Sequence, residues 1–157
     1  MKEALNLNNR KWKSFKVSDI FYIFTGALLN KEEMQGGNIP RITATDINNG
    51  VALFTNRVES NKFRTFENFI SISFLGSVFY QKNLSSLDMK IHGISPKGYN
   101  LNSYSAKFLI PIIKKFAFKY HYGYQLSTSI LRRQKMLLPI NNESLPDWLF
   151  MENYIKQ

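Results

Sequence analysis

The chain has 157 residues, 44% of them hydrophobic and none of them cysteine, with 21 Lys and Arg against 11 Asp and Glu and a net charge of +10. This length and composition predict one folded domain and exclude disorder, disulfides and thiolate zinc sites. The positive charge indicates an anionic partner, with a basic but inert surface as the alternative.

The N-terminal third is predicted to alternate between short elements and loops. A strand is expected over residues 12–17, then a short helix over 18–26 that Ser18 caps, then a loop over 30–40. The stretch RITATDINNGVALF, residues 41–54, predicts a β-hairpin, because Asn and Gly tolerate the positive φ of a tight turn. Period-two alternation then places one arginine and two threonines of its first strand on one face.

The middle of the chain combines strands with the clearest helix. Residues 69–81, FISISFLGSVFYQ, predict two strands around Gly76, the first with one buried face, and a further strand is expected over 89–94. Apolar residues four apart predict a helix over 103–120. Pro111 inside it predicts either a kink or a helix that begins near this proline.

The C-terminal part is predicted to hold a second short helix over 127–134, a strand over 135–140 and a last helix from Pro146, with Asp147 close to its N-terminal dipole. These elements together indicate the α+β class, with a mixed, mostly antiparallel sheet and flanking helices.

Residues for catalysis are scarce. No glycine-rich turn follows a strand, so no cofactor is predicted. His92 and His121 are isolated from one another in sequence, so no metal site is predicted. One enzyme class stays open as an alternative: in a small metal-dependent nuclease, Asp46 and Asp88 would hold Mg²⁺.

Binding chemistry is better represented. The run KYHYGYQLSTS, residues 119–129, gathers Tyr, Gln, Ser and Thr, which contact phosphates and base edges, although a polar loop with buried tyrosines has the same composition. No Asp or Glu occurs between Asp88 and Glu143. The candidate DNA-binding residues are Arg41, Thr43, Thr45, Asn48, Asn49, Gln81, Lys82, Lys115, Lys119, Tyr122, Tyr124, Gln125, Ser127, Arg132 and Arg133. For the face of the hairpin strand, a solvated sheet edge is the alternative.

The chain resembles the target recognition domains of type I restriction-modification specificity subunits, which also occur fused to type IIG restriction-methylation enzymes. The resemblance rests on five segments in family order, which include Asn-Asn-Gly, Gly-x-x-Phe-Tyr, Tyr-Gly-Tyr, Leu-Pro-Ile and Pro-Asp-Trp and cover nearly the whole chain.

This resemblance implies a non-catalytic module that recognises double-stranded DNA for an adenine methyltransferase subunit and a restriction subunit. It implies a target recognition domain over residues 1–145 and the start of a docking helix over 146–157, in either a half subunit that forms a homodimer or an excised domain. The predicted docking residues are Trp148, Leu149, Met151, Tyr154 and Ile155. A specificity-subunit mimic that captures a methyltransferase is a further alternative. We predict a cytoplasmic protein without a membrane partner, because no apolar run could span a bilayer and the N-terminus lacks the apolar core of a signal peptide.

Overall fold

Short strands in three small sheets, together with four helices, make up the computed structural model, which describes residues 3–157. The strands are β1 (Trp12–Lys16), β2 (Phe21–Thr25), β3 (Ile39–Ile42), β4 (Val51–Thr55), β5 (Thr65–Phe66), β6 (Phe69–Ser73), β7 (Val78–Gln81), β8 (Ser85–Leu87), β9 (Ile91–Pro96) and β10 (Lys135–Pro139). The helices are α1 (Val17–Ile20), α2 (Ser103–Ala117), α3 (Thr128–Arg133) and α4 (Trp148–Lys156). Single 3₁₀ turns cover Leu7–Asn9, Lys31–Glu33 and Asn48–Gly50.

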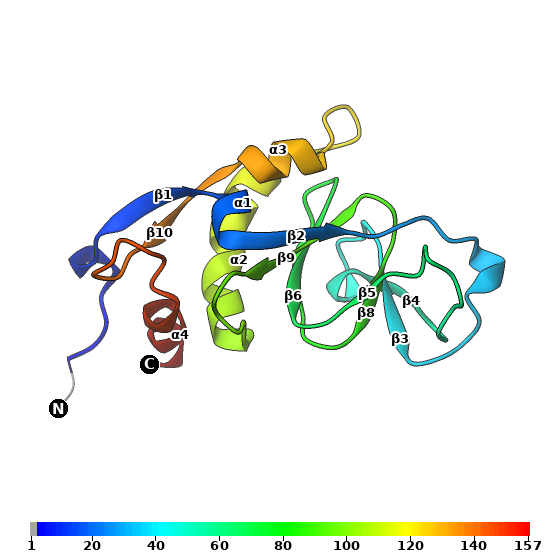
Figure 1. Cartoon of the computed structure of the whole chain (residues 1–157), viewed down its shortest axis with the longest axis horizontal. Coiled ribbons are helices and arrows are strands. Elements are labelled where there is room, and N and C mark those ends of the chain that lie inside the picture. Colours follow the sequence, from blue (N-terminus) through cyan, green and yellow to red (C-terminus); the bar gives the residue numbers. More distant parts are fainter. Residues whose placement is uncertain (1–2) are drawn as a thin grey trace.

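The predicted α+β class is confirmed, but the strands form three sheets rather than one. The central sheet has the order β2-β9-β6-β7 and is antiparallel throughout, and β1 pairs with β10 in a separate antiparallel ribbon. The third sheet, β4-β3-β8-β5, contains the parallel pair β3–β8. The molecule is elongated, with both termini, β1, β10 and α4 at one end and the third sheet at the other (Figure 1).

The first predicted helix is mostly wrong. Only Val17–Ile20 is helical, and Phe21–Thr25 continues as β2 in the central sheet, paired with β9. The segment FYIFT consists of aromatic and β-branched residues, which suit a pleated surface better than a helix. Ser18 does not cap the helix, because Lys16 occupies the N-cap position.

The predicted hairpin is confirmed. β3 and β4 pair antiparallel, and the turn between them places Asn48, Asn49 and Gly50 at φ values of 52°, 56° and 80°. These are left-handed conformations, which Asn and Gly adopt more readily than other residues. The turn lies against β7, which positions it beside the central sheet.

The strand β6 is buried on both faces rather than on one. It lies between β9 and β7 in the central sheet, and its two serines, Ser71 and Ser73, are buried. Their hydroxyls are satisfied by hydrogen bonds: Ser73 Oγ accepts from the backbone N–H groups of Leu75 and Ser77, at 3.2 and 3.0 Å. A buried hydroxyl with partners costs little free energy, which explains the polar residues in this strand.

The long helix α2 forms as its apolar repeat predicts. Asn102 caps it by accepting hydrogen bonds from the N–H groups of Tyr104 and Ser105, at 3.0 and 3.1 Å. The helix continues through Pro111, so the alternative that it begins near this proline is wrong. At its C-terminal end, Gly76 packs so closely that a Cβ there would lie 2.3 Å from the carbonyl oxygen of Ala117.

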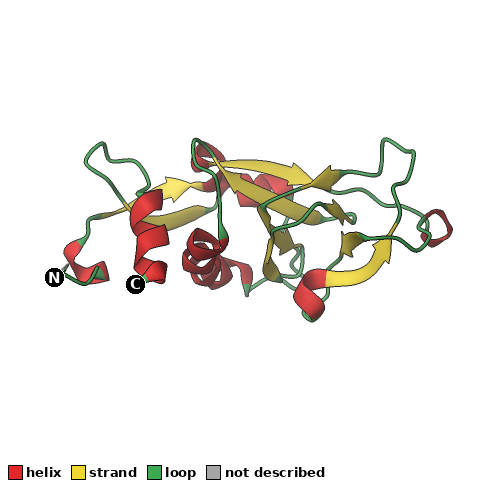
Figure 2. Ribbon diagram, turned by 90° about the horizontal axis from the view of Figure 1, so that it is seen from below, coloured by secondary structure: helices red, strands yellow, loops and turns green. Residues whose placement is uncertain are grey.

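The C-terminal helix α4 packs beside α2, and both contribute to the main hydrophobic core (Figure 2). Asp147 is its N-cap and accepts a hydrogen bond from the N–H of Phe150 at 3.0 Å. The division of the chain between residues 145 and 146 stays a prediction, since the helix and the preceding residues share one core. Within residues 3–157, none of the helices has the length and apolarity to cross a membrane.

Candidate nucleic-acid interface

The segment between α2 and α3 forms a loop that projects from the rest of the molecule (Figure 1). His121 and Tyr124 pair through two backbone hydrogen bonds of 3.0 and 2.9 Å, and His121 Nδ1 accepts a third from the N–H of Gly123 at 3.1 Å. Tyr122, at the tip, is 78% exposed. The loop therefore presents an aromatic side chain to solvent on a hydrogen-bonded turn.

The base of this loop is anchored in the core. Tyr120 is buried, its ring lies 5.3 Å from that of Tyr124, and burial raises the pKa of its hydroxyl. Leu126 is also buried, and its N–H donates to the carbonyl oxygen of Phe74 at 3.0 Å. Buried anchors on either side of the tip hold the loop in one place relative to the central sheet.

Gln125 has both ends of its side-chain amide engaged. Lys90 Nζ donates to its Oε1 at 3.1 Å, and its Nε2 donates to the carbonyl oxygen of Tyr122 at 3.3 Å. Lys90 Nζ also lies 5.4 Å from the centre of the Phe74 ring, within the range of a cation–π contact. An amide oriented in this way keeps one further N–H and one further lone pair for a ligand.

A cavity of about 330 Å³ opens beside Gln125 and is also lined by Lys90, His92 and Thr128. His92 is 2% exposed, and its Nε2 lies 3.0 Å from Thr128 Oγ1. Burial lowers the pKa of the His92 imidazole. The ring therefore stays neutral at pH 7.

Sequence reasoning missed Lys90 and His92 as members of this site, whereas Thr128 belongs to the candidate run over residues 119–129. Lys90 is 35 residues from Gln125, and His92 is 36 residues from Thr128, so no local spacing connects them. The chain runs from β9 through α2 to the loop, and only the folded position of α2 brings the loop back beside the start of β9. The nearest signal is the position of Lys90 in the acid-free stretch after Asp88.

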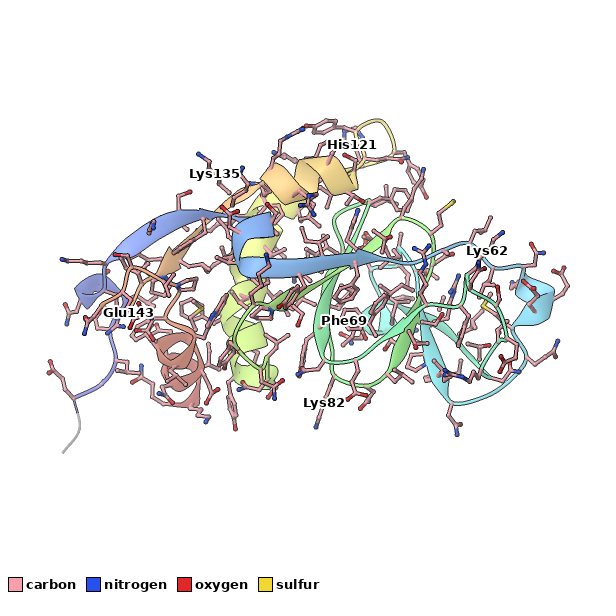
Figure 3. The ribbon with its side chains drawn as sticks, viewed as in Figure 1. Lys62, Phe69, Lys82, His121, Lys135 and Glu143 are labelled. Carbon is pink, nitrogen blue, oxygen red and sulfur yellow. The ribbon has the colours of Figure 1, made fainter. Side chains whose placement is uncertain are left out.

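The predicted basic residues near the loop are exposed. Arg132 and Arg133 lie in the last turn of α3, whose N-cap is Ser127, and Lys119 Nζ lies 5.4 Å from the Tyr120 ring centre. Lys115 is also exposed, but it lines an apolar groove between α2 and β10 rather than the loop. His121 and Lys135 lie along the same edge of the molecule in Figure 3.

Arg41 is buried, with an exposed fraction of 1%. Its Nη1 donates to Ser86 Oγ at 2.8 Å and to the carbonyl oxygen of Leu87 at 3.0 Å. Its Nη2 donates to the carbonyl oxygen of Ala27 at 2.8 Å and to Asp88 Oδ1 at 3.0 Å. Burial lowers the pKa of the guanidinium, and the Asp88 carboxylate partly offsets this. The prediction that Arg41 contacts DNA is wrong, because its side chain is buried and its guanidinium donates its hydrogen bonds within the protein.

Gln81 is also a structural residue. It is buried, and its Nε2 donates to the carbonyl oxygen of Asn49 at 2.8 Å and to Ser71 Oγ at 3.2 Å. Asn49 is exposed, but its Nδ2 donates to the carbonyl oxygen of Tyr80 at 2.9 Å. The prediction of Gln81 as a DNA contact is wrong, since both residues fasten the hairpin turn to β7.

The other hairpin candidates lie outside the strand. β3 ends at Ile42, so Thr43 and Thr45 belong to the loop rather than to a strand face shared with Arg41. Asn48 is exposed in the turn, and Lys82 is exposed after β7. In Figure 3, Lys82 and His121 lie at opposite edges of the molecule, so Lys82 is not brought next to the tyrosine loop.

Two of the five predicted docking residues are in the core. Trp148 and Met151 are buried, so their assignment as docking residues is wrong. Tyr154 and Ile155 are half-buried and line the groove beside α2, whereas Leu149 is 64% exposed. A helix that covers the core of its own domain leaves only part of its apolar surface for a partner.

The two carboxylates of the nuclease alternative have separate structural partners. Asp46 Oδ1 accepts a hydrogen bond from Ser77 Oγ at 2.6 Å, and Asp88 forms an ion pair with Arg41. Among residues 3–157, no three His, Asp or Glu side chains come together in a possible metal site. The geometry offers no support for this alternative.

Comparison with known proteins settles the family. The model of the type I restriction modification DNA specificity domain matches residues 9–157. The chain belongs to this family. It is 33% identical over 154 residues to the specificity subunit S.BcgI of the type II restriction enzyme BgcI from Heyndrickxia coagulans, which covers 96% of this chain and 44% of that protein.

Solved structures of specificity subunits share the fold. The S subunit of a type I restriction-modification system from M. genitalium matches with a TM-score of 0.62 at 20% identity, over 91% of this chain and 38% of that one. The HsdS subunit from Thermoanaerobacter tengcongensis matches with a TM-score of 0.57 at 15% identity, over 98% of this chain and 38% of that one. The chain thus spans less than half the length of these relatives.

Proposed function

We propose that this specificity domain binds a defined sequence of double-stranded DNA and directs a methyltransferase subunit and a restriction subunit to it. The observation that carries the proposal is the projecting loop, residues 119–127, with an exposed tip, a fixed base and the two arginines of α3 beside it. It lies in the part of the sequence that contains no Asp or Glu between Asp88 and Glu143. A phosphate backbone would meet no repelling charge from this segment.

Base contacts are assigned to the loop itself. Gln125 is oriented by Lys90 and by the carbonyl oxygen of Tyr122, so its free donor and acceptor point in a fixed direction. A fixed Gln amide can bond the N6 and N7 atoms of adenine in the major groove. Tyr122 and Tyr124 provide aromatic surface and hydroxyl groups next to this amide.

Phosphate contacts are assigned to the long side chains around the loop. Lys119, Arg132 and Arg133 are exposed, and each carries its charge at the end of a flexible aliphatic chain. Such side chains neutralise phosphate charge rather than discriminate between sequences. Thr43, Thr45, Asn48 and Lys82 stay candidates for a second contact region, because they belong to other segments than the loop over residues 119–127. Asn49 keeps a role in the turn.

Catalysis is assigned to the partner subunits. The relative S.BcgI is itself named a specificity subunit of a restriction enzyme, which supports the same division of roles here. We expect neither methyl transfer nor DNA cleavage from this chain alone, and no cofactor. Methylation of DNA by the highly purified chain with S-adenosylmethionine, or cleavage with Mg²⁺, would contradict this. Assembly as a homodimer and a cytoplasmic location stay predictions.

The test is selection of bound sequences from a randomised DNA pool by the chain in complex with its methyltransferase subunit. Replacing Gln125 by Ala should change the preferred base at one position and cost about 1–3 kcal/mol on the original site. Replacing Arg132 by Ala should weaken binding to all sequences alike. Gln35→Ala is the matched control, since Gln35 is exposed and lies in the loop after β2. An unchanged motif for Gln125→Ala would refute the assignment of the loop.

A further inference from the structure

An apolar groove of about 560 Å³ runs along the outer face of α2, and the DNA-binding role does not account for it. Ile112 forms part of one wall, Leu137 of β10 part of another, and Trp12 and Tyr154 line it as well. Leu137 is 54% exposed although it belongs to this apolar lining. A concave apolar surface of this volume is within the range of sites that bury a ligand or a partner side chain.

The charged residues of the groove all have the same sign. Lys107, Lys115 and Lys135 line it, and none of its lining residues is acidic. None of these lysines takes part in an ion pair within residues 3–157. On α2, Lys107 and Lys115 are eight residues apart, which is about 12 Å along a helix at 1.5 Å per residue. The groove therefore combines an apolar floor with positive charges at defined positions.

We propose that this groove docks an amphipathic helical segment of a partner protein, with apolar side chains toward the floor and carboxylates about two turns apart opposite Lys107 and Lys115. An apolar centre with a polar, charge-complementary edge is the usual anatomy of a protein interface. Insertion of the apolar face of a helix into a groove is a recurrent way of recognising peptides. The inference rests on the proposed function only in that the domain assembles with a partner subunit.

Two other occupants fit the groove less well. DNA would satisfy the lysines but has no apolar segment to cover Ile112 and Leu137. A second copy of this chain would bring another net charge of +10 to a positively charged surface. An acidic partner satisfies both the apolar lining and the charge.

The groove also gives the predicted docking helix a different role. Tyr154 and Ile155 face the groove from α4, while Trp148 and Met151 hold that helix in the core. Docking would then use the inner edge of α4 together with α2 and β10. Leu149, which is exposed but is not a lining residue of the groove, serves as a matched control position.

The experiment places a photo-crosslinking amino acid at position 137, and at position 149 as control, in the full chain in its host cells. Mass spectrometry identifies the peptide attached at each position. We expect position 137 to attach a segment of a different protein that has apolar residues at helical spacing and a net negative charge. Attachment to DNA, to a second copy of this chain or to nothing at position 137 would overturn the proposal, as would the same segment at position 149.

Binding of the purified partner then tests the apolar lining and the lysines of the groove separately. Leu137→Glu should weaken binding at least tenfold, and Leu149→Glu should leave it within twofold, because only Leu137 lines the groove. Both side chains are mostly exposed, so neither substitution buries a charge in the folded chain. Lys115→Glu should also weaken binding of the partner. Replacing the partner's carboxylate opposite Lys115 by Lys should restore the binding. If Lys115→Glu binds as the wild type does, the proposed charge pairing is wrong. The DNA motif selected by Leu137→Glu should be unchanged, which separates this inference from the proposed DNA-binding role.

Discussion

At the scale of single residues, Arg41 connects three segments of the chain. Its guanidinium, on β3, donates hydrogen bonds to β8, to Asp88 after β8 and to the loop after β2. A charged group is stable in the interior only when such partners replace water. The residue therefore supports the third sheet rather than a contact with a ligand.

Replacing Arg41 by Ala should lower the free energy of unfolding by about 3 kcal/mol. The change leaves buried acceptors without donors, and removal of one partner of a buried ion pair is costly; Asp88 is partly solvated, which keeps the loss at the lower end. Urea titration measures it, with Arg57→Ala, at an exposed arginine, as control. A loss below about 0.5 kcal/mol, the range of surface substitutions, would contradict this account.

The position of Arg41 also shows how far the sequence predicts single sites. Period-two alternation on the hairpin strand could be derived, but the partner strand on the other side could not, because β8 is more than forty residues away in the chain. A buried arginine is also rare enough that exposure is the better expectation from sequence. Gln125 is a candidate from local composition alone, whereas its hydrogen-bond partner Lys90 could be identified only from the fold.

At the scale of elements, the sequence pattern predicts a helix or a turn correctly where interactions between neighbouring residues determine the conformation. The four-residue apolar repeat of α2 and the Asn-Asn-Gly turn both formed as expected. The helix predicted over residues 21–25 is wrong because the segment FYIFT has no clear period. Pairing with β9 determines its conformation instead. The assignment of Trp148 and Met151 of α4 as docking residues is wrong for a related reason. An apolar stripe in the sequence does not show whether it packs against the core of its own domain or against a partner.

Removal of α4 should unfold the domain rather than only abolish docking. Trp148, Phe150 and Met151 are buried, and each large apolar side chain removed from a core costs about 2–5 kcal/mol. A chain that ends at Pro146 should lose its cooperative thermal transition, as measured by circular dichroism. Leu149→Ala should keep the transition temperature of the wild type. A cooperative transition in the truncated chain would show that α4 is dispensable for folding.

The contact between α4 and the start of α2 should make stability depend on pH. Hydrogen bonds from Lys156, Tyr99 and Asn102 lower the pKa of Glu152 from 4.5 to about 2. The unfolded chain takes up this proton near pH 4.5 and the folded chain only near pH 2, so the stabilisation is complete above about pH 5 and is lost as the pH falls through this window.

Glu152→Gln should therefore lose less stability than the wild type between pH 5 and pH 2. Denaturant titrations at several pH values in this range measure the difference. Glu143→Gln, at an exposed carboxylate in the turn before α4, should keep the pH dependence of the wild type. Equal slopes for the wild type and Glu152→Gln would contradict the role of this carboxylate.

At the scale of the whole molecule, charge and apolar surface are divided between two regions. The projecting loop and α3 carry polar and basic groups, while the groove between α2 and β10 is apolar with a basic rim. Composition alone indicates the excess of positive charge. It cannot show this division, because Lys115 and Arg132 look alike in sequence and only the fold places one in the groove and the other on α3.

The salt dependence of DNA binding should report how many of these charges meet phosphate. If about five phosphates are neutralised, the logarithm of the affinity should fall with the logarithm of salt concentration at a slope of about −4.5, since each contributes about 0.9. Arg132→Ala should make the slope less negative by about 0.9, because one released counterion is lost. Lys62→Ala should leave it unchanged, since Lys62 is exposed in the segment before β5 and is not one of the proposed phosphate contacts. Fluorescence anisotropy with one duplex over a salt series measures all three slopes. A wild-type affinity that does not respond to salt would contradict phosphate binding by this surface. Equal changes of the slope in Arg132→Ala and Lys62→Ala would mean that phosphate contacts are spread over the whole molecule.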